Sequence, residues 1–271
     1  MSVRLVALDL DGTLTGDGMR ISPRVRGALR KALDAGVHVT LASCRPFHQT
    51  RLFAEDLGIH EPLICYQGAV VQDPGSEEVY FRRGVPLHLA QEFIDVAREH
   101  GWDLCAYVDD RLYVERVTPL VRFYAEYGPI KEELNPVGDW KAFLSREPIK
   151  LIVVAEAEQA AKANDLLHER FAGRLRIVRS FDCFVEGTNL AASKGQALSF
   201  LAQKLGVTQA ETMAIGDNDN DADMVAWAGL GVAMGNASPA VKAGAYYVAP
   251  PIEEDGAAEA IERFILEQHG G

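Results

Sequence analysis

The chain has 271 residues, of which 48% are hydrophobic and 24% charged, a balance typical of globular proteins with one large domain or two smaller ones. Its formal net charge is −12, whereas proteins that bind the phosphates of nucleic acids usually present a basic surface. We therefore expect no nucleic-acid partner. The negative net charge does not exclude a small phosphorylated ligand, because local cations can make the electrostatic potential positive inside one cleft.

The cysteines and the apolar segments indicate the compartment. No two cysteines form a C-x-x-C pair, and a chain of this length needs no disulfides, so we expect reduced thiols. No segment approaches the ~20 apolar residues of a membrane span, and residues 5–8 are too short for the core of a signal peptide. We expect a cytoplasmic protein, monomeric or homodimeric, with no membrane partner.

The first part of the chain alternates between strand and helix patterns. Residues 3–8, 37–42 and 62–66 are short apolar runs, typical of strands that are buried on both faces. Residues 22–36 and 47–58 have helical spacing and end in glycine, and the first of them begins with a serine cap and a first-turn proline. This alternation predicts a parallel sheet with right-handed crossovers.

After about residue 82 the pattern becomes mixed, and the alternation resumes near residue 194. The mixed stretch predicts helices at 86–100 and 158–171 and strands at 104–108, 112–116, 150–155, 175–179 and 183–186, with a hairpin turn at 109–111. The resumed alternation predicts helices at 194–205 and 222–228 and strands at 212–215 and 230–233. We therefore expect a doubly wound α/β core, residues 1–82 and 187–271, interrupted by an α/β domain at 83–186.

Two carboxylates follow the first predicted strand, in the sequence DLDGTL that begins at Asp9. Ligands of open parallel sheets bind beyond the carboxyl ends of the strands, so we expect Asp9 and Asp11 to face a ligand site there. One carboxylate can attack phosphorus, while the other can protonate the leaving oxygen and later activate water. A solvated Asp-Gly turn at a strand end is the alternative.

Two further candidates are weaker when taken singly. Ser43 follows the second strand, where its hydroxyl could bind a phosphoryl oxygen, although it could equally be a helix N-cap. Lys194 begins a predicted helix, where the helix dipole disfavours a cation unless an anion is near. An exposed surface lysine is the alternative there.

The fourth candidate is the sequence GDNDNDADM, which begins at Gly216 after a predicted buried strand. Oxygen ligands at this density suit Mg²⁺. Asp217, Asp219 and Asp221 have the spacing of an EF-hand loop, but the glycine and the final glutamate of that loop are absent. A solvated acidic loop remains as an alternative.

In this order, the four segments resemble motifs I–IV of the haloacid dehalogenase (HAD) superfamily and, more narrowly, the Cof-type sugar-phosphate phosphatases. The matching sequences are DLDGTL, LASCR, SKGQAL and GDNDNDADM, the last followed by AGLGVAMGNAS. This final string, which ends in Asn236-Ala237-Ser238, is the most specific. The resemblance covers residues 1–82 and 187–271, and it implies a Rossmann-like core with a cap domain of the C2B type.

The resemblance also implies a role for each matching residue. Asp9 would be the nucleophile and a Mg²⁺ ligand, and Asp11 would be the general acid and base and offer its backbone carbonyl to the metal. Asp217 would be the second carboxylate ligand, and Asp221 would support the metal shell. The residues that would bind the phosphoryl group or the substrate are Ser43, Cys44, Arg45, Lys194 and Asn220.

The implied activity is Mg²⁺-dependent hydrolysis of phosphomonoesters, such as sugar phosphates, through an aspartyl phosphate. A phosphotransferase or mutase with the same nucleophile is one alternative, and a non-catalytic protein that binds phosphorylated metabolites is another. The chain departs from the family pattern at Cys44, where many relatives have glycine, at Gln67, where asparagine is usual, and at residues 191–192. None of these departures removes a catalytic group.

Overall fold

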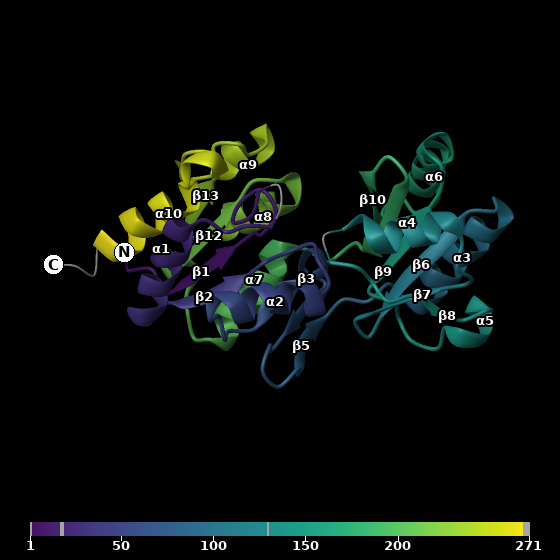
Figure 1. Cartoon of the computed structure of the whole chain (residues 1–271), viewed down its shortest axis with the longest axis horizontal. Helices are drawn as coiled ribbons and strands as arrows, with labels where there is room; N and C mark the ends of the chain where they lie inside the picture. The colour runs from purple at the N-terminus through teal and green to yellow at the C-terminus, as the bar shows by residue number, and fades with distance from the viewer. Residues whose placement is uncertain (1, 17–18, 129, 268–271) are drawn as a thin grey trace. The chain divides into compact units, whose positions relative to one another are not determined.

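The computed structural model describes residues 2–16, 19–128 and 130–267, and Figure 1 traces the chain. It divides into two compact units, one made of Met1–Arg82 with Ser193–Gly271 and the other of Arg83–Ala192. None of the helices in the described ranges combines the length and the apolar character that crossing a bilayer would require. The predicted fold class, a parallel α/β core with an inserted α/β unit, is confirmed.

The first unit contains a parallel sheet of five strands in the order β14-β13-β12-β1-β2. Its strands are β1 (Leu5–Leu8), β2 (His38–Leu41), β12 (Thr212–Gly216), β13 (Leu230–Ala233) and β14 (Tyr247–Val248). The interior strand β1 pairs with β12 and β2, and none of its four residues has exposed surface. This burial explains its uninterrupted apolar sequence.

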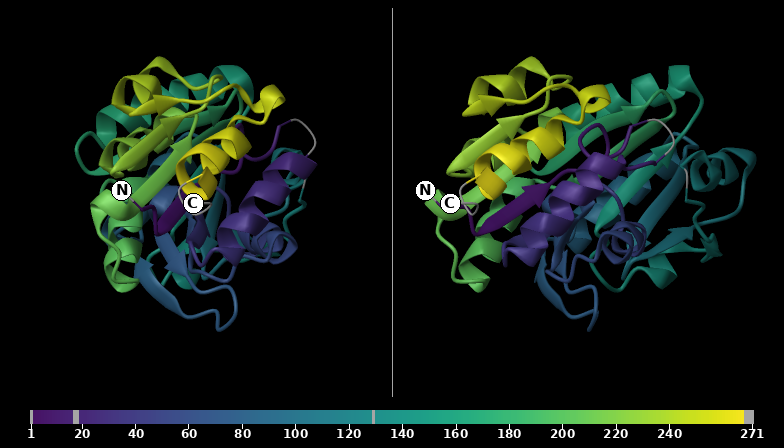
Figure 2. Two further views of the ribbon diagram at one scale, coloured as in Figure 1. Left: turned by 90° about the vertical axis from the view of Figure 1, so that its left-hand side faces the viewer. Right: turned by 60° about the vertical axis from the view of Figure 1, so that its left-hand side comes forward.

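Helices lie on both sides of this sheet, as Figure 2 shows for the purple α1 and the green α7. Ser22 caps α1 by accepting the Val25 N–H, and Ser193 caps α7 by accepting the Gln196 N–H. The helices of the unit are α1 (Pro23–Asp34), α2 (Phe47–Leu57), α7 (Lys194–Lys204), α8 (Ala222–Trp227), α9 (Pro239–Gly244) and α10 (Gly256–Ile261). Short 3₁₀ turns span Tyr66–Gly68, Gln209–Glu211, Asp219–Asp221 and Ile252–Glu254, and a π-helical turn spans Glu262–Leu266.

The third predicted strand does not continue the parallel sheet as expected. It forms β3 (Leu63–Cys65) of a small antiparallel sheet with β4 (Val70–Gln72) and β5 (Val79–Arg82). A single bridge between Ala42 and Ile64 links it to the end of β2. The chain reverses directly after β3 because Tyr66 and Gln67 adopt positive φ, at 53° and 58°, so β4 returns along β3.

The second unit is a six-stranded sheet in the order β10-β11-β9-β6-β7-β8. All its pairings are antiparallel except that of β7 with β8. Its elements are α3 (Leu87–Glu99), β6 (Asp103–Val108), β7 (Arg111–Val114), α4 (Pro119–Tyr127), β8 (Asn135–Pro136), α5 (Trp140–Phe143), β9 (Lys150–Val154), α6 (Ala157–Arg170), β10 (Leu175–Phe181) and β11 (Phe184–Asn189). The predicted hairpin is confirmed, since Asp109 and Asp110 connect β6 to β7 with φ of 47° and 61°.

The expected boundary at residue 187 needs correction. It falls inside β11, which continues to Asn189 and pairs with both β9 and β10. Gly187 also packs so closely on Phe93 of α3 that an added Cβ would lie 2.8 Å from the ring. Residues 187–192 therefore belong to the second unit, because strand pairing carries the chain past the last apolar residue of the predicted strand.

Candidate active site at the ends of the parallel strands

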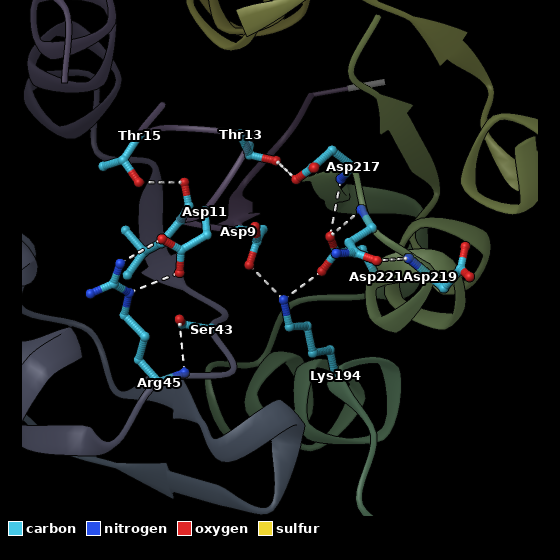
Figure 3. A network of polar contacts seen from close by, with 12 residues as sticks. Asp9, Asp11, Thr13, Thr15, Ser43, Arg45, Lys194, Asp217, Asp219 and Asp221 are labelled. Atoms are coloured by element: carbon cyan, nitrogen blue, oxygen red, sulfur yellow. Dashed lines mark hydrogen bonds and ion pairs between the residues drawn. The ribbon is translucent and has the colours of Figure 1, made fainter. Parts of the chain in front are cut away.

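Acidic and hydroxyl side chains collect where neighbouring strands of the parallel sheet end. Asp9 follows β1, Ser43 comes shortly after β2, and Asp217 follows β12. Adjacent parallel strands end at the same edge of a sheet, and Figure 3 shows the resulting group together with Lys194.

Lys194, the first residue of α7, has a fully buried side chain. Its Nζ donates to Asp9 Oδ1 at 2.6 Å and to Asp221 Oδ1 at 2.5 Å. Burial by itself would lower the pKa of Lys194, but the carboxylates of Asp221 and Asp9 raise the pKa above its usual value. The lysine therefore stays charged and joins the loop after β1 to the loop after β12.

The nucleophile candidate Asp9 is only 4% exposed. Burial raises its pKa well above the usual 3.8, and Lys194 opposes this effect only in part. Repulsion from Asp221 and Asp217 raises the pKa further. A second cation beside Asp9 would favour its ionised form.

Asp217 lies against the turn that follows Asp9. Thr13 Oγ1 donates to Asp217 Oδ1 at 2.9 Å. Gly12 has φ of 90°, and an added Cβ there would lie 2.2 Å from Asp217 Oδ2. Burial is the largest of the effects that raise the pKa of Asp217 to about 6.

A hard divalent cation fits this arrangement. Carboxylate oxygens of Asp9, Asp217 and Asp221 lie within 4.8 Å of one another. Both oxygens of Asp221 already accept hydrogen bonds, Oδ1 from Lys194 and Oδ2 from the N–H groups of Asp217 and Asn218. Asp9 and Asp217 are therefore the carboxylates with oxygens available to a metal ion. Lys194 alone does not balance the negative charge of the three carboxylates, so a bound cation would neutralise the remainder.

The carboxylate of Asp11 points away from this cluster and toward Arg45 (Figure 3). Arg45 donates from Nε to Asp11 Oδ2 at 2.8 Å and from Nη2 to Oδ1 at 2.6 Å, a bidentate pair. Burial would lower the pKa of Arg45, but the hydrogen bonds and charge of Asp11 raise it overall. Arg45 was expected at the phosphate, whereas here its guanidinium is engaged by Asp11.

The other expected phosphate ligands lie in the loop after β2 and in the 3₁₀ turn Asp219–Asp221. Ser43 is fully buried, and its Oγ accepts the N–H of Arg45 at 3.1 Å, which leaves the hydroxyl hydrogen for another acceptor. Cys44 is half-buried between them in the chain. Asn220 Oδ1 is buried and has no hydrogen-bond partner among the described residues. An orphaned amide oxygen of this kind is typical of a site that an ordered water or a cation completes, whereas a phosphoryl oxygen would need the N–H of the same amide.

Three contacts of the site were not anticipated from the sequence. These are the Thr13–Asp217 hydrogen bond, the Asp11–Arg45 pair, and the approach of Gly68 to the start of α7, where an added Cβ would lie 2.1 Å from the Ser193 carbonyl oxygen. The opposite charges of Asp11 and Arg45, at the ends of adjacent strands, were the available signal for the second contact. No sequence pattern indicated the third.

Comparison with known proteins identifies the family of this chain. The family model that describes haloacid dehalogenase-like hydrolases matches residues 6–261. The 5-amino-6-(5-phospho-D-ribitylamino)uracil phosphatase YcsE of Bacillus subtilis is 31% identical over 98% of this chain and 97% of its own. The pyridoxal phosphate phosphatase YbhA of Escherichia coli is 29% identical over 98% of each chain.

A solved structure gives the same result for the fold. A haloacid dehalogenase-like hydrolase from Bacteroides thetaiotaomicron has a TM-score of 0.87 and 30% identity, over 97% of this chain and 100% of its own. The resemblance noted in the sequence is thereby confirmed, and the chain belongs to the haloacid dehalogenase-like hydrolases.

Proposed function

We propose that this enzyme is a Mg²⁺-dependent phosphatase that hydrolyses small phosphorylated metabolites, with Asp9 as its nucleophile. The observation that supports this most is the contact of buried Lys194 with Asp9 at 2.6 Å and with Asp221 at 2.5 Å, beside Asp217. A nucleophile, a fixed cation and hard oxygen donors thus share one small volume. Phosphoryl transfer depends mainly on such positioning and on neutralisation of charge.

Asp9 and Asp217 would hold the metal, with the backbone carbonyl of Asp11 as the third protein ligand that the family resemblance implies. Asp221 would fix the loop by accepting the N–H groups of Asp217 and Asn218. When bound, the cation would neutralise charge on the phosphoryl oxygens.

The chain's own residues would carry the two chemical steps. A carboxylate oxygen of Asp9 attacks phosphorus, the bond to the leaving oxygen breaks, and Asp11 protonates that oxygen. Asp11 then takes a proton from water, whose oxygen attacks phosphorus and releases phosphate and free Asp9. Lys194, Ser43 and Asn220 would bind the non-bridging oxygens. The bidentate pair with Arg45 holds the Asp11 carboxylate away from Asp9, so Asp11 would leave this pair before it protonates the leaving oxygen.

The proposed substrates are sugar phosphates and similar small phosphomonoesters. The names of both relatives, YcsE and YbhA, specify small phosphorylated compounds. The second unit, Arg83–Ala192, would act as a cap that selects the group bearing the phosphate.

A panel of phosphorylated metabolites, assayed for release of inorganic phosphate with Mg²⁺ and with EDTA, tests this proposal. We expect Mg²⁺-dependent release from the parent, none above background from Asp9→Asn, and parental rates from the exposed control Asp34→Asn, whose carboxylate contacts Arg30 on α1. Failure of the folded, Mg²⁺-loaded parent to release phosphate from any ester would contradict the proposal. Formation of a sugar bisphosphate instead of inorganic phosphate would point to a mutase.

A further inference from the structure

The segment Asn236-Ala237-Ser238 has a distinctive sequence but no place in the chemistry described so far. It lies between β13 and α9, after the strand that neighbours β12 in the parallel sheet. The described contacts of its two polar residues lead to the loops that carry Asp9 and Asp217.

Asn236 bridges the turn after β1 and the segment that precedes α10. Its Nδ2 donates to the Gly12 carbonyl oxygen at 2.9 Å, and its Oδ1 accepts the N–H of Ile252 at 3.1 Å. Gly12 is the residue that packs against Asp217, with room for no Cβ between them. The amide of Asn236 therefore fixes the turn that sets the approach of the Asp9 loop to Asp217.

Ser238 holds the other metal-bearing loop. Its backbone N–H donates to the Asp217 carbonyl oxygen at 2.9 Å, and its hydroxyl donates to Asp219 Oδ1 at 2.5 Å. The same hydroxyl oxygen caps α9 by accepting the Val241 N–H. Ser238 thus holds the backbone of Asp217 and the side chain of Asp219, the two residues that flank Asn218.

We propose that residues 236–238 form a clamp whose task is to set the separation between the Asp9 loop and the Asp217 loop, and so the geometry of the metal site. Asn236 and Ser238 are positioning residues in this scheme, and the scheme rests on the proposed Mg²⁺-dependent function. Asn236 is exposed, so water could form hydrogen bonds with its amide in place of Gly12 and Ile252. Its two contacts are therefore not explained by a need to pair a buried polar group. Residues that hold the metal-binding groups in place without binding the metal themselves typically change metal affinity or activity by about 10- to 100-fold when they are removed.

The variant Asn236→Asp tests the Gly12 contact with little change of shape. A carboxylate can still accept the Ile252 N–H but cannot donate to the Gly12 carbonyl. Its added negative charge would by itself strengthen binding of a cation, so weaker binding reports lost geometry. Asn164→Asp, at a half-buried position of α6 in the second unit, is the matched control, since its amide contacts only the adjacent Asp165 among the described residues.

The measurement is the Mg²⁺ dissociation constant by isothermal titration calorimetry, together with kcat and KM for p-nitrophenyl phosphate. We expect Asn236→Asp to bind Mg²⁺ about tenfold more weakly and to lose kcat at least as strongly, while KM and the melting temperature stay near the parental values. The control should match the parent throughout. A folded Asn236→Asp protein with parental Mg²⁺ affinity and kcat overturns the inference.

If Asn236→Asp does not fold, the pair Ser238→Ala and Ser238→Thr decides. Threonine keeps the hydroxyl that donates a hydrogen bond to Asp219, whereas alanine removes it. Mg²⁺ affinity should therefore fall in the alanine variant and stay near the parental value in the threonine variant. Equal and parental affinity in both would overturn the clamp. The calorimetry does not depend on turnover, so a parent that binds Mg²⁺ without releasing phosphate would refute the proposed function while this comparison still stands.

Discussion

The hydroxyl of Thr13 donates a hydrogen bond to Asp217 Oδ1 at 2.9 Å and thereby joins the loop after β1 to the loop after β12. This bond lowers the pKa of Asp217 against the effect of burial. Thr13→Val keeps the shape but removes the donor, so the pKa of Asp217 should rise above its value of about 6. Because a protonated carboxylate does not bind a metal, the Mg²⁺ concentration for half-maximal activity should rise, by about tenfold near pH 6.

Mg²⁺ activation curves across a pH series check this expectation. The parent and Thr13→Val should converge as the pH rises. Thr15→Val is the control, because Thr15 bonds the Leu10 carbonyl in the same turn, and its loss should leave the pH dependence unchanged. Identical Mg²⁺ activation for parent and Thr13→Val at every pH would show that Thr13 does not act on Asp217.

The raised pKa of Asp217 also predicts how stability depends on pH without metal. The folded pKa of about 6 lies above the usual 3.8, so the fold favours the protonated form. This contribution to the free energy of unfolding is fully present below about pH 3.8 and is lost as the pH rises through about 6. The melting temperature in EDTA should therefore fall between about pH 5 and pH 7.5 relative to that of Asp217→Asn, which has no such ionisation. Thermal scans at both pH values test this, and parallel behaviour of the two proteins would count against it.

Lys194 should be needed for folding as well as for activity. Lys194→Met leaves the buried carboxylates of Asp9 and Asp221 uncompensated, and breaking a buried ion pair typically costs about 3–5 kcal/mol. Urea unfolding in EDTA should show a loss of that order in the free energy of unfolding. The double variant Lys194→Met/Asp221→Asn should recover part of the stability without activity, whereas equal stability of the double and single variants would contradict a charge-based cause.

Alanine variants of Gly12 and Gly36 distinguish the effect of backbone strain from the effect of a steric clash with Asp217. Both adopt positive φ, 90° and 80°, but a Cβ at Gly36 would meet no atom within 4 Å, whereas one at Gly12 would meet Asp217 Oδ2 at 2.2 Å. We expect each alanine variant to lose about 1 kcal/mol of stability from the left-handed backbone, and only Gly12→Ala to lose activity and Mg²⁺ affinity. Equal activity of the two variants in a phosphatase assay would contradict the role given to this contact.

The sequence predicted β1, β2, β12 and β13 because most of their residues are buried and apolar, as in Leu5–Leu8, but it missed the edge strand β14, whose two residues are half-buried and exposed. It failed where a turn decides the pairing partner, as at Tyr66 and Gln67, whose positive φ directs β4 back along β3. Periodicity describes which face of an element is buried but not which neighbour it joins.

For the candidate site, too, the sequence predicted some features and not others. Motif spacing identified the residues that lie near Lys194, since parallel strands deliver their following loops to one edge of the sheet. The pairing of Arg45 with Asp11 depends on side-chain reach across that edge, and spacing along the chain carries no information about it. The contacts of Asn236 with Gly12 and Ile252 were hidden for the same reason.

The most direct measurement is the chemical identity of the covalent intermediate. Borohydride reduces an acyl phosphate to an alcohol. An enzyme that is quenched with borohydride while it turns over p-nitrophenyl phosphate in the presence of Mg²⁺ should therefore contain homoserine in place of Asp9. Peptide mass spectrometry should find this conversion at residue 9 and not at Asp217 or Asp221, and only when substrate is present. Conversion at another residue, or none in an enzyme that is turning over, would contradict the account.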